Sequence, residues 1–291
     1  MNVLAVFLAV ATLAHAEDLS TTATSNQKYI YFTSDGGPNG GTPHVLDAAL
    51  EADIKMTFFV NAENLDLSSW NPRLEHLNQK SIQRMVFEGH AMGDLSFNHM
   101  VHNSDEGQSN PINTYRNISD IDYFGAMNVR PLVRFFTGKK IERQQFGRVV
   151  ITMSKLVRLP HTDHWRVNMT NGDVIKHNCH ACTLPKASND IAIEIADELY
   201  NRGRSVFGWD VEWQSNWGRG LSTTYQEFME KVVKFKKGFL ATKGGPNKLV
   251  VLTHDHGFIN NREDAEQYVS FFKAAKAAGF EFRTLDTFHS D

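Results

Sequence analysis

The chain has 291 residues, of which 41% are hydrophobic and 22% are charged, and its formal net charge is −3 at pH 7. This hydrophobic fraction supplies a core for one large domain or two small ones, which excludes an intrinsically disordered chain. The near-neutral charge provides no basic field of the kind that attracts nucleic acids or anionic membranes, so neither is an expected partner.

The first 16 residues have the pattern of a secretory signal peptide. An apolar run from Val3 to Leu13 precedes Ala14 and Ala16, which are small residues typical of a cleavage site. The run is too short to span a bilayer. A buried N-terminal helix is the alternative, but a polar linker follows at once, at residues 17–27. We therefore expect a secreted, extracellular protein with one domain over residues 28–291.

From residue 28 onward, short apolar runs alternate with amphipathic segments of helical length. The first half predicts strands at 28–33, 55–60 and 90–96, helices at 44–52 and 120–137, and the end of a helix at 80–88, before Gly89. The second half predicts strands at 156–159, 205–211, 249–253 and 281–284 and helices at 187–202, 223–237 and 263–278. Strands that alternate with crossover helices form a parallel sheet, so we expect an α/β fold, a closed or nearly closed (β/α) barrel of roughly seven strands.

Polar residues follow most of the predicted strands. They are Asp35, Asp94, His99, Arg158, Asp210, Glu212, His254, Asp255 and His256. In β/α barrels the chemistry collects at the C-terminal ends of the strands, so this set predicts hydrolysis by paired carboxylates and imidazoles, with an arginine to hold a carboxylate. A structural role is the alternative for each residue alone, since an Asp after a strand often caps the next helix.

The two cysteines, Cys179 and Cys182, lie in the sequence HNCHAC. In an oxidising compartment such a pair forms a disulfide. His177 and His180 interleave with them, so a metal-binding or redox site and free thiols remain open alternatives. Two sequons, at Asn117 and Asn168, predict glycosylation if the source is eukaryotic.

Five segments occur in the order expected of one enzyme family. They are YFTSDGGP from Tyr31, GHAMGDLSFNHMVHN from Gly89, VRLPHTDHWRV from Val157, GWDVEWQSNWG from Gly208 and LVVLTHDHGF from Leu249. They resemble the TFDDGP, GHxxGNHSxxHMxHN, RxPY, WxxD-type and LTHD elements of the NodB-homology polysaccharide deacetylases, most closely the secreted chitin oligosaccharide deacetylases of marine bacteria. The resemblance spans residues 29–287 and implies a distorted (β/α) barrel of roughly seven parallel strands.

The resemblance also implies a mechanism. Family members use zinc or another divalent metal, held by one Asp and two His, to polarise the acetamide carbonyl of an N-acetylglucosamine polymer and to activate water. By position, Asp35 matches the base, Arg158 the residue that positions the base, His254 the acid and Glu212 the carboxylate that orients this histidine. Chitin or a chitin-like oligosaccharide is the implied partner.

The metal positions depart from the family pattern. Gly36 stands where the metal-binding Asp is expected and Leu95 where the first metal-binding His is expected, so His99 is the one matched ligand. A catalytic zinc needs at least three protein ligands. Replacement ligands would have to come from other nearby residues, namely Asp35, Asp94 and His161.

Four tryptophans lie in or beside the matched segments: Trp165, Trp209, Trp213 and Trp217. Their faces are suited to stacking on sugar rings or to packing the barrel wall, and we expect two of them to touch ligand.

Two interpretations of the function follow from these motifs. The first is a secreted, catalytically impaired relative, a pseudoenzyme that keeps a groove for chitin-like polymers. The second is an active N-deacetylase with altered metal coordination. A metal-binding or redox role of residues 177–182 is a lesser third.

Overall fold

The computed structural model describes residues 27–65, 71–96, 99, 143–179, 186–238, 240–260 and 263–289. The expected signal peptide and nearly all of the linker, the predicted helix at 120–137, Asn117, His180 and Cys182 lie outside these ranges. No helix in the described part of the chain is both long and apolar enough to cross a membrane.

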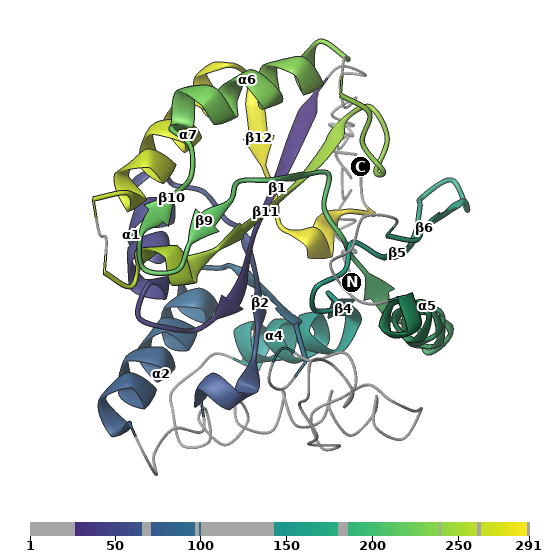
Figure 1. Ribbon diagram of the computed structural model, residues 1–291, viewed down its shortest axis with the longest axis horizontal. Helices are drawn as coiled ribbons and strands as arrows, with labels where there is room; N and C mark the ends of the chain where they lie inside the picture. The colour runs from purple at the N-terminus through teal and green to yellow at the C-terminus, as the bar shows by residue number, and fades with distance from the viewer. Residues whose placement is uncertain are drawn as a thin grey trace, which may run out of the picture.

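One curled sheet organises the described chain, with strand order β6-β5-β7-β4-β3-β2-β1-β11-β8 and β12 paired with β1 (Figure 1). The parallel strands are β1 (Lys28–Gly37), β2 (Thr57–Val60), β3 (Ala91–Asp94), β4 (Leu156–Val157), β7 (Ser205–Val206), β8 (Val211–Glu212), β11 (Lys248–His254) and β12 (Phe280–Phe282). The α/β class and the parallel sheet are confirmed. The expected ring of strands does not close by strand pairing among the described residues, because β6 and β8 end the sheet.

The strand predicted at 205–211 is two short strands: β7 pairs with β4 and β5, and β8 pairs with β11 at the other end of the sheet. Residues 207–210 cross between them. The backbone N–H of Phe207 donates to the carbonyl of Val157 at 2.8 Å, and that of Asp210 to the carbonyl of Val250 at 2.8 Å. This crossing segment therefore joins the two sides of the curled sheet.

An antiparallel hairpin was not predicted. It consists of β5 (Trp165–Asn168) and β6 (Val174–His177), and β5 also runs antiparallel to β7. The turn contains Asn171-Gly172, a dipeptide that favours hairpin turns and was the available signal. The side chain of Asn171 accepts a hydrogen bond from the backbone N–H of Asp173 at 3.1 Å and so fixes the turn.

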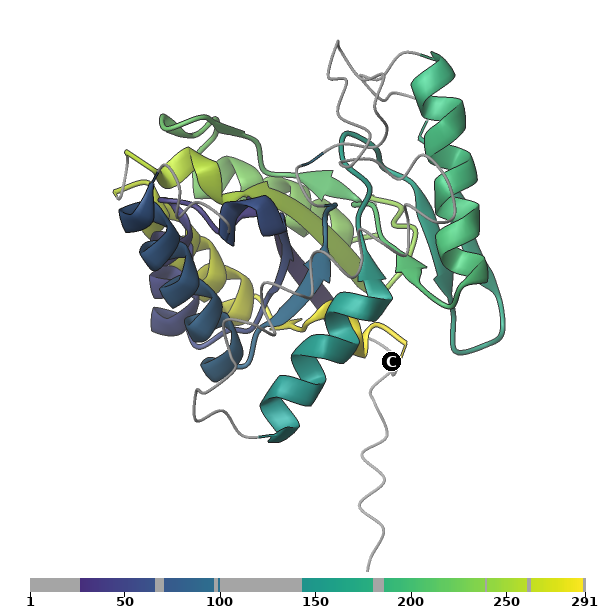
Figure 2. The same cartoon turned by 90° about the horizontal axis from the view of Figure 1, so that it is seen from below.

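The main helices are α1 (Thr42–Glu51), α2 (Pro72–Phe87), α4 (Arg143–Lys155), α5 (Lys186–Asn201), α6 (Tyr225–Lys236) and α7 (Ala265–Ala277). Figure 2 shows α1, α2 and α7 on one side of the sheet, and α5 with the β5–β6 hairpin on the other. The end of a helix predicted at 80–88 is the C-terminal half of α2, which begins at Pro72, where Asn71 caps it by accepting the N–H of Leu74 at 3.1 Å.

Alternation along β1 separates two hydrophobic layers. Ile30 and Phe32 pack under the helices, whereas Tyr29 and Tyr31 pack inside the curled sheet with Phe59, among others. The same alternation directs Thr33 and Asp35 inward. The concave side of the sheet is therefore apolar near the start of β1 and polar at its C-terminal end.

Two of the four tryptophans are core residues, which leaves Trp209 and Trp217 as the pair that could touch a ligand. Trp165 is fully buried in the inner layer, and Trp213 is fully buried against the helices, where it stacks on Phe228 with ring centroids 4.6 Å apart. The indole N–H of Trp213 donates to the carbonyl of Thr223 at 3.1 Å. Neither ring has a free face for a sugar.

We predict that Trp213→Ala lowers the free energy of unfolding by about 3–5 kcal/mol, because it removes a fully buried indole and leaves a cavity. The exposed Trp217 is the matched control, and Trp217→Ala should change the free energy of unfolding by no more than about 0.5 kcal/mol. Urea denaturation followed by circular dichroism measures both. Equal losses in the two variants would contradict the assigned burial.

Candidate functional site

Asp35 and His254 lie on adjacent strands at the C-terminal edge of the sheet. The register of β1 with β11 places them directly opposite each other, and the register of β11 with β8 places Glu212 opposite Leu252. Directly after Asp35 the register shifts at Gly36, whose φ of 82° is in the region that favours glycine. The motif positions that the sequence predicted to converge are thus brought together.

Arg158 connects Asp35 to the rest of the site. One guanidinium nitrogen, Nη1, donates to Asp35 Oδ1 at 2.8 Å and to Thr33 Oγ1 at 2.7 Å. The other nitrogens donate to two backbone carbonyls of the crossing segment, Nε to Phe207 at 3.0 Å and Nη2 to Gly208 at 2.8 Å. Arg158 is completely buried. This geometry fits the predicted role of positioning the carboxylate.

Burial raises the pKa of Asp35 to about 6, and the neighbouring Arg158 opposes this rise without cancelling it. The carboxylate is therefore largely ionised at pH 7, with a proton affinity higher than that of an exposed Asp. A carboxylate with a pKa near the working pH is suited to accepting a proton as a general base.

His254 is predominantly neutral at pH 7, because burial lowers its pKa to about 4 and the positive Arg158 adds to the effect. Its Nδ1 lies 3.8 Å from Glu212 Oε1, too far for a hydrogen bond. Burial raises the pKa of Glu212, and the negative Asp35 adds to that rise. In this state His254 is a proton acceptor, so the predicted role as an acid requires that a bound ligand first raise its pKa.

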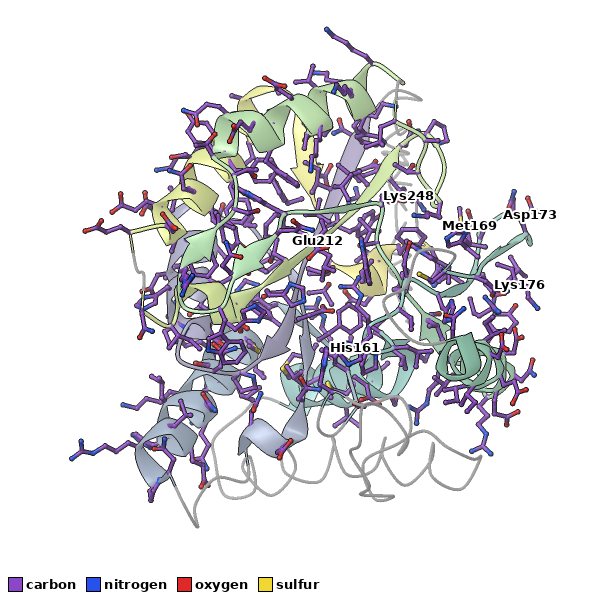
Figure 3. All side chains as sticks on the ribbon, in the orientation of Figure 1. His161, Met169, Asp173, Lys176, Glu212 and Lys248 are labelled. Atoms are coloured by element: carbon purple, nitrogen blue, oxygen red, sulfur yellow. The ribbon has the colours of Figure 1, made fainter. Side chains whose placement is uncertain are left out.

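Two further imidazoles meet at the same edge. The rings of His99 and His161 are in edge-to-face contact with centroids 4.5 Å apart. Both residues adopt left-handed backbone conformations, with φ of 64° and 61°, which is uncommon outside glycine. Burial lowers the pKa of His99 to about 3, and the neighbouring histidines contribute. Figure 3 labels His161, near β4, and Glu212, which lies on the end strand β8.

The residues at the expected metal positions do not fit a three-ligand zinc site. Gly36 has no side chain, and Leu95 is buried in the inner apolar layer. Asp94 is engaged elsewhere, since its carboxylate accepts the N–H of Ser96 at 2.9 Å and lies 3.5 Å from Arg204. Within the described ranges, no three or more His, Cys, Asp or Glu side chains are grouped so as to hold a metal ion.

Asp255 is a buried site residue to which sequence reasoning gave no specific role. Its carboxylate accepts hydrogen bonds from Asn39 Nδ2 at 2.7 Å and from the hydroxyl of Thr42. Asn39 belongs to the glycine-rich turn after β1, whereas Asp255 begins the short helix η4 (Asp255–Phe258) immediately after His254. Asp255 therefore ties the segment that follows Asp35 to the segment that follows His254.

The other two tryptophans lie near this edge. Trp209 is half-buried, with its ring 5.7 Å from the guanidinium carbon of Arg158. Its backbone N–H donates to Asp163 at 2.8 Å. Trp217 is exposed and stacks on His256.

Asn168 is the last residue of β5, and Cys179 follows the end of β6. Cys179 is disulfide-bonded, as expected, and the only other cysteine of the sequence is Cys182. The disulfide leaves no thiolate at Cys179 to bind a metal. The glycosylation candidate Asn168 is exposed and accepts a hydrogen bond from the hydroxyl of Tyr200.

Comparisons with known proteins agree with these motifs. Residues 22–121 match the family model described as polysaccharide deacetylase, a range that contains Asp35 and His99. The whole chain is similar to the chitin disaccharide deacetylase of Vibrio alginolyticus, with 24% identity over 97% of this chain and 76% of the relative. By motif order, family-model match and overall similarity, the chain resembles the polysaccharide deacetylases. Arg158, Glu212 and His254 lie outside the range of the family model.

Solved structures of the family share the fold. The peptidoglycan N-acetylglucosamine deacetylase Bc1960 superposes with a TM-score of 0.52 at 16% identity, over 91% of this chain and 89% of that one. The catalytic domain of the peptidoglycan N-acetylglucosamine deacetylase from Eubacterium rectale gives 0.51 at 19% identity, over 92% and 95%. The distorted α/β barrel expected from the motifs is confirmed, as a curled, mostly parallel sheet.

We predict that Asp35→Asn changes the pH dependence of stability. Because the native pKa of Asp35 exceeds the unfolded value, this carboxyl stabilises the fold at low pH, and the contribution is lost as the pH rises through about 6. Relative to the variant, the parent should lose about 1 kcal/mol of unfolding free energy between pH 5 and pH 7.5. Urea denaturation across this range measures the difference.

The exposed Asp53→Asn is the control for replacing a carboxylate by an amide, because Asp53 lies in an exposed turn away from the strand ends. Its curve should run parallel to that of the parent. A parent that gained stability over Asp35→Asn with rising pH would show that Arg158 outweighs burial in setting this pKa.

Proposed function

We propose that the protein is a secreted member of the family that binds chitin-like oligosaccharides of N-acetylglucosamine at the C-terminal edge of the sheet, without the metal-dependent deacetylation implied by the motifs. The observation that carries this proposal is the pair Gly36 and Leu95. The resemblance places metal-coordinating side chains at these two positions, but Gly36 has no side chain and Leu95 has a buried apolar one.

The retained polar residues support binding without requiring catalysis. Arg158 bridges Asp35 and the crossing segment, so loss of either charged partner would leave the other buried and unpaired, at a cost of several kcal/mol. Structural need alone is enough to retain this pair. The Vibrio relative, named as acting on chitin disaccharide, supports a carbohydrate ligand with N-acetylglucosamine rings. The N-terminal apolar run and Ala14-His15-Ala16 support secretion.

A second candidate function is favoured by one contact. The ring of His161 touches that of His99, the single matched ligand, and both are present where a metal-dependent deacetylase with altered coordination would need them. Burial lowers the pKa of His99 to about 3, so its lone pair is free at neutral pH. This candidate still needs further donors, since Asp35 is held by Arg158.

The deciding experiment compares metal content with acetate release. Purified protein is loaded with zinc, desalted and analysed for metal, and acetate release from chitin oligosaccharides is measured alongside direct binding of the same sugars by calorimetry. We expect binding with little zinc and no acetate. About one zinc per chain, lost together with acetate release in His99→Ala, would instead establish the active deacetylase.

We further predict that Gly36→Asp combined with Leu95→His creates zinc affinity and deacetylation. A β-carbon at Gly36 would meet nothing within 4 Å, so the Asp has room, although the φ of 82° costs about 1 kcal/mol for a residue with a side chain. Zinc content and acetate release are measured as for the parent. If the double variant bound zinc no better than the parent, the assignment of these two motif positions would be wrong.

A further inference from the structure

Trp217 differs from the three other tryptophans in the described part of the chain. Its side chain is 70% exposed, whereas Trp165 and Trp213 are fully buried and Trp209 is half-buried. The indole is nearly parallel to the imidazole of His256, with an interplanar angle of 19° and centroids 4.7 Å apart. One face of the indole is therefore backed by a ring, while the large exposed area leaves the other open to solvent.

The hairpin that carries Trp217 is fixed to the site. It consists of β9 (Ser215–Asn216) and β10 (Gly220–Leu221), with Trp217 in the turn. The N–H of Gly218 donates to the carbonyl of His256 at 3.0 Å, and the hydroxyl of Ser215 to the carbonyl of His254 at 3.3 Å. Gly257 packs so closely on Ser215 that a β-carbon would lie 2.7 Å from the Ser215 side chain. These contacts fix the position of the turn that carries the indole.

The position of this ring relates it to Asp35. His256 is two residues after His254, and their rings are 4.9 Å apart. Since His254 lies opposite Asp35 in the sheet, the successive ring contacts of His254, His256 and Trp217 form a row that begins at the strand position beside Asp35. Burial lowers the pKa of both His254 and His256 to about 4, so the row is uncharged at pH 7.

Single exposed apolar side chains are common and carry no meaning alone. Leu50, Phe87 and Ile151 are also exposed, but they lie on the helices α1, α2 and α4. Trp217 differs from them in three respects: His256 stacks on one face of its indole, hydrogen bonds fix the turn that carries it, and it lies beside the predicted site. These are features of a preorganised contact surface for a flat, uncharged ring.

We propose that the exposed face of Trp217 stacks on a pyranose ring of the oligosaccharide that lies outside the ring held at Asp35, so that the protein selects oligosaccharides over free N-acetylglucosamine. The negative face of an indole attracts the C–H groups on the apolar face of a pyranose. This proposal rests on the proposed function and extends it from a ligand class to a minimum ligand length.

The test compares N-acetylglucosamine with its β-1,4-linked disaccharide and trisaccharide by calorimetry at pH 7, using the full chain. We expect the parent to bind the trisaccharide more tightly than the monosaccharide. In Trp217→Ala the ratio of these two affinities should fall about tenfold, in the range of one aromatic contact. Trp217→Phe, which keeps an aromatic face, should retain most of the ratio.

Phe87→Ala is the matched control, since Phe87 is an exposed aromatic residue at the C-terminal end of α2 and belongs to no part of the site. It should leave the ratio unchanged, and thermal unfolding verifies that each variant is folded. A ratio in Trp217→Ala equal to that of the parent would refute the stacking role while leaving the proposed function in place. A parent that binds none of the three sugars would refute both.

Discussion

The hydrogen bonds of Arg158 hold together both the fold and the site. The sheet does not close through strand pairing in its described part, and residues 207–210 cross the opening instead. Two carbonyls of that crossing, at Phe207 and Gly208, are satisfied by the guanidinium, which also binds Asp35. A guanidinium has five donors in a fixed planar arrangement, so it can serve a backbone segment and a carboxylate at once, as a lysine ammonium cannot.

Because these hydrogen bonds stabilise the fold, the polar residues of the site can be present whether or not the site is catalytic. Asp35 and Arg158 pair two buried charges, and Asp255 is bonded to Asn39 and Thr42, so each has a structural role that does not require catalysis. The positions that differ from the family pattern, Gly36 and Leu95, belong to neither network. Two coordinating side chains can therefore be absent from those positions without disturbing the hydrogen bonds that shape the edge of the sheet.

The sequence was sufficient to predict which residues converge, because the C-terminal ends of parallel strands share one edge of a sheet. Asp35, Arg158, Glu212 and His254 follow from that rule and from the motifs. It was not sufficient where tertiary packing decides. The burial of Trp165 and Trp213 and the bonds of Asp255 depend on partners far away in the chain. The β5–β6 hairpin is local, and its Asn171-Gly172 turn was a readable signal that the pattern of alternating strands and helices did not include. The sequence alone does not distinguish a tryptophan that faces a ligand from one that packs against a helix.

The link from Asp255 to the turn after β1 has a thermodynamic consequence. Because the two segments flanking Asp35 and His254 are joined by protein atoms, their spacing is set before any ligand arrives. Association then loses little conformational entropy in the protein, and the ordering of the ligand dominates the entropic cost. An oligosaccharide that is itself stiff would meet the least opposition to binding, and affinity would follow the rigidity of the glycosidic linkage as well as the identity of the sugar.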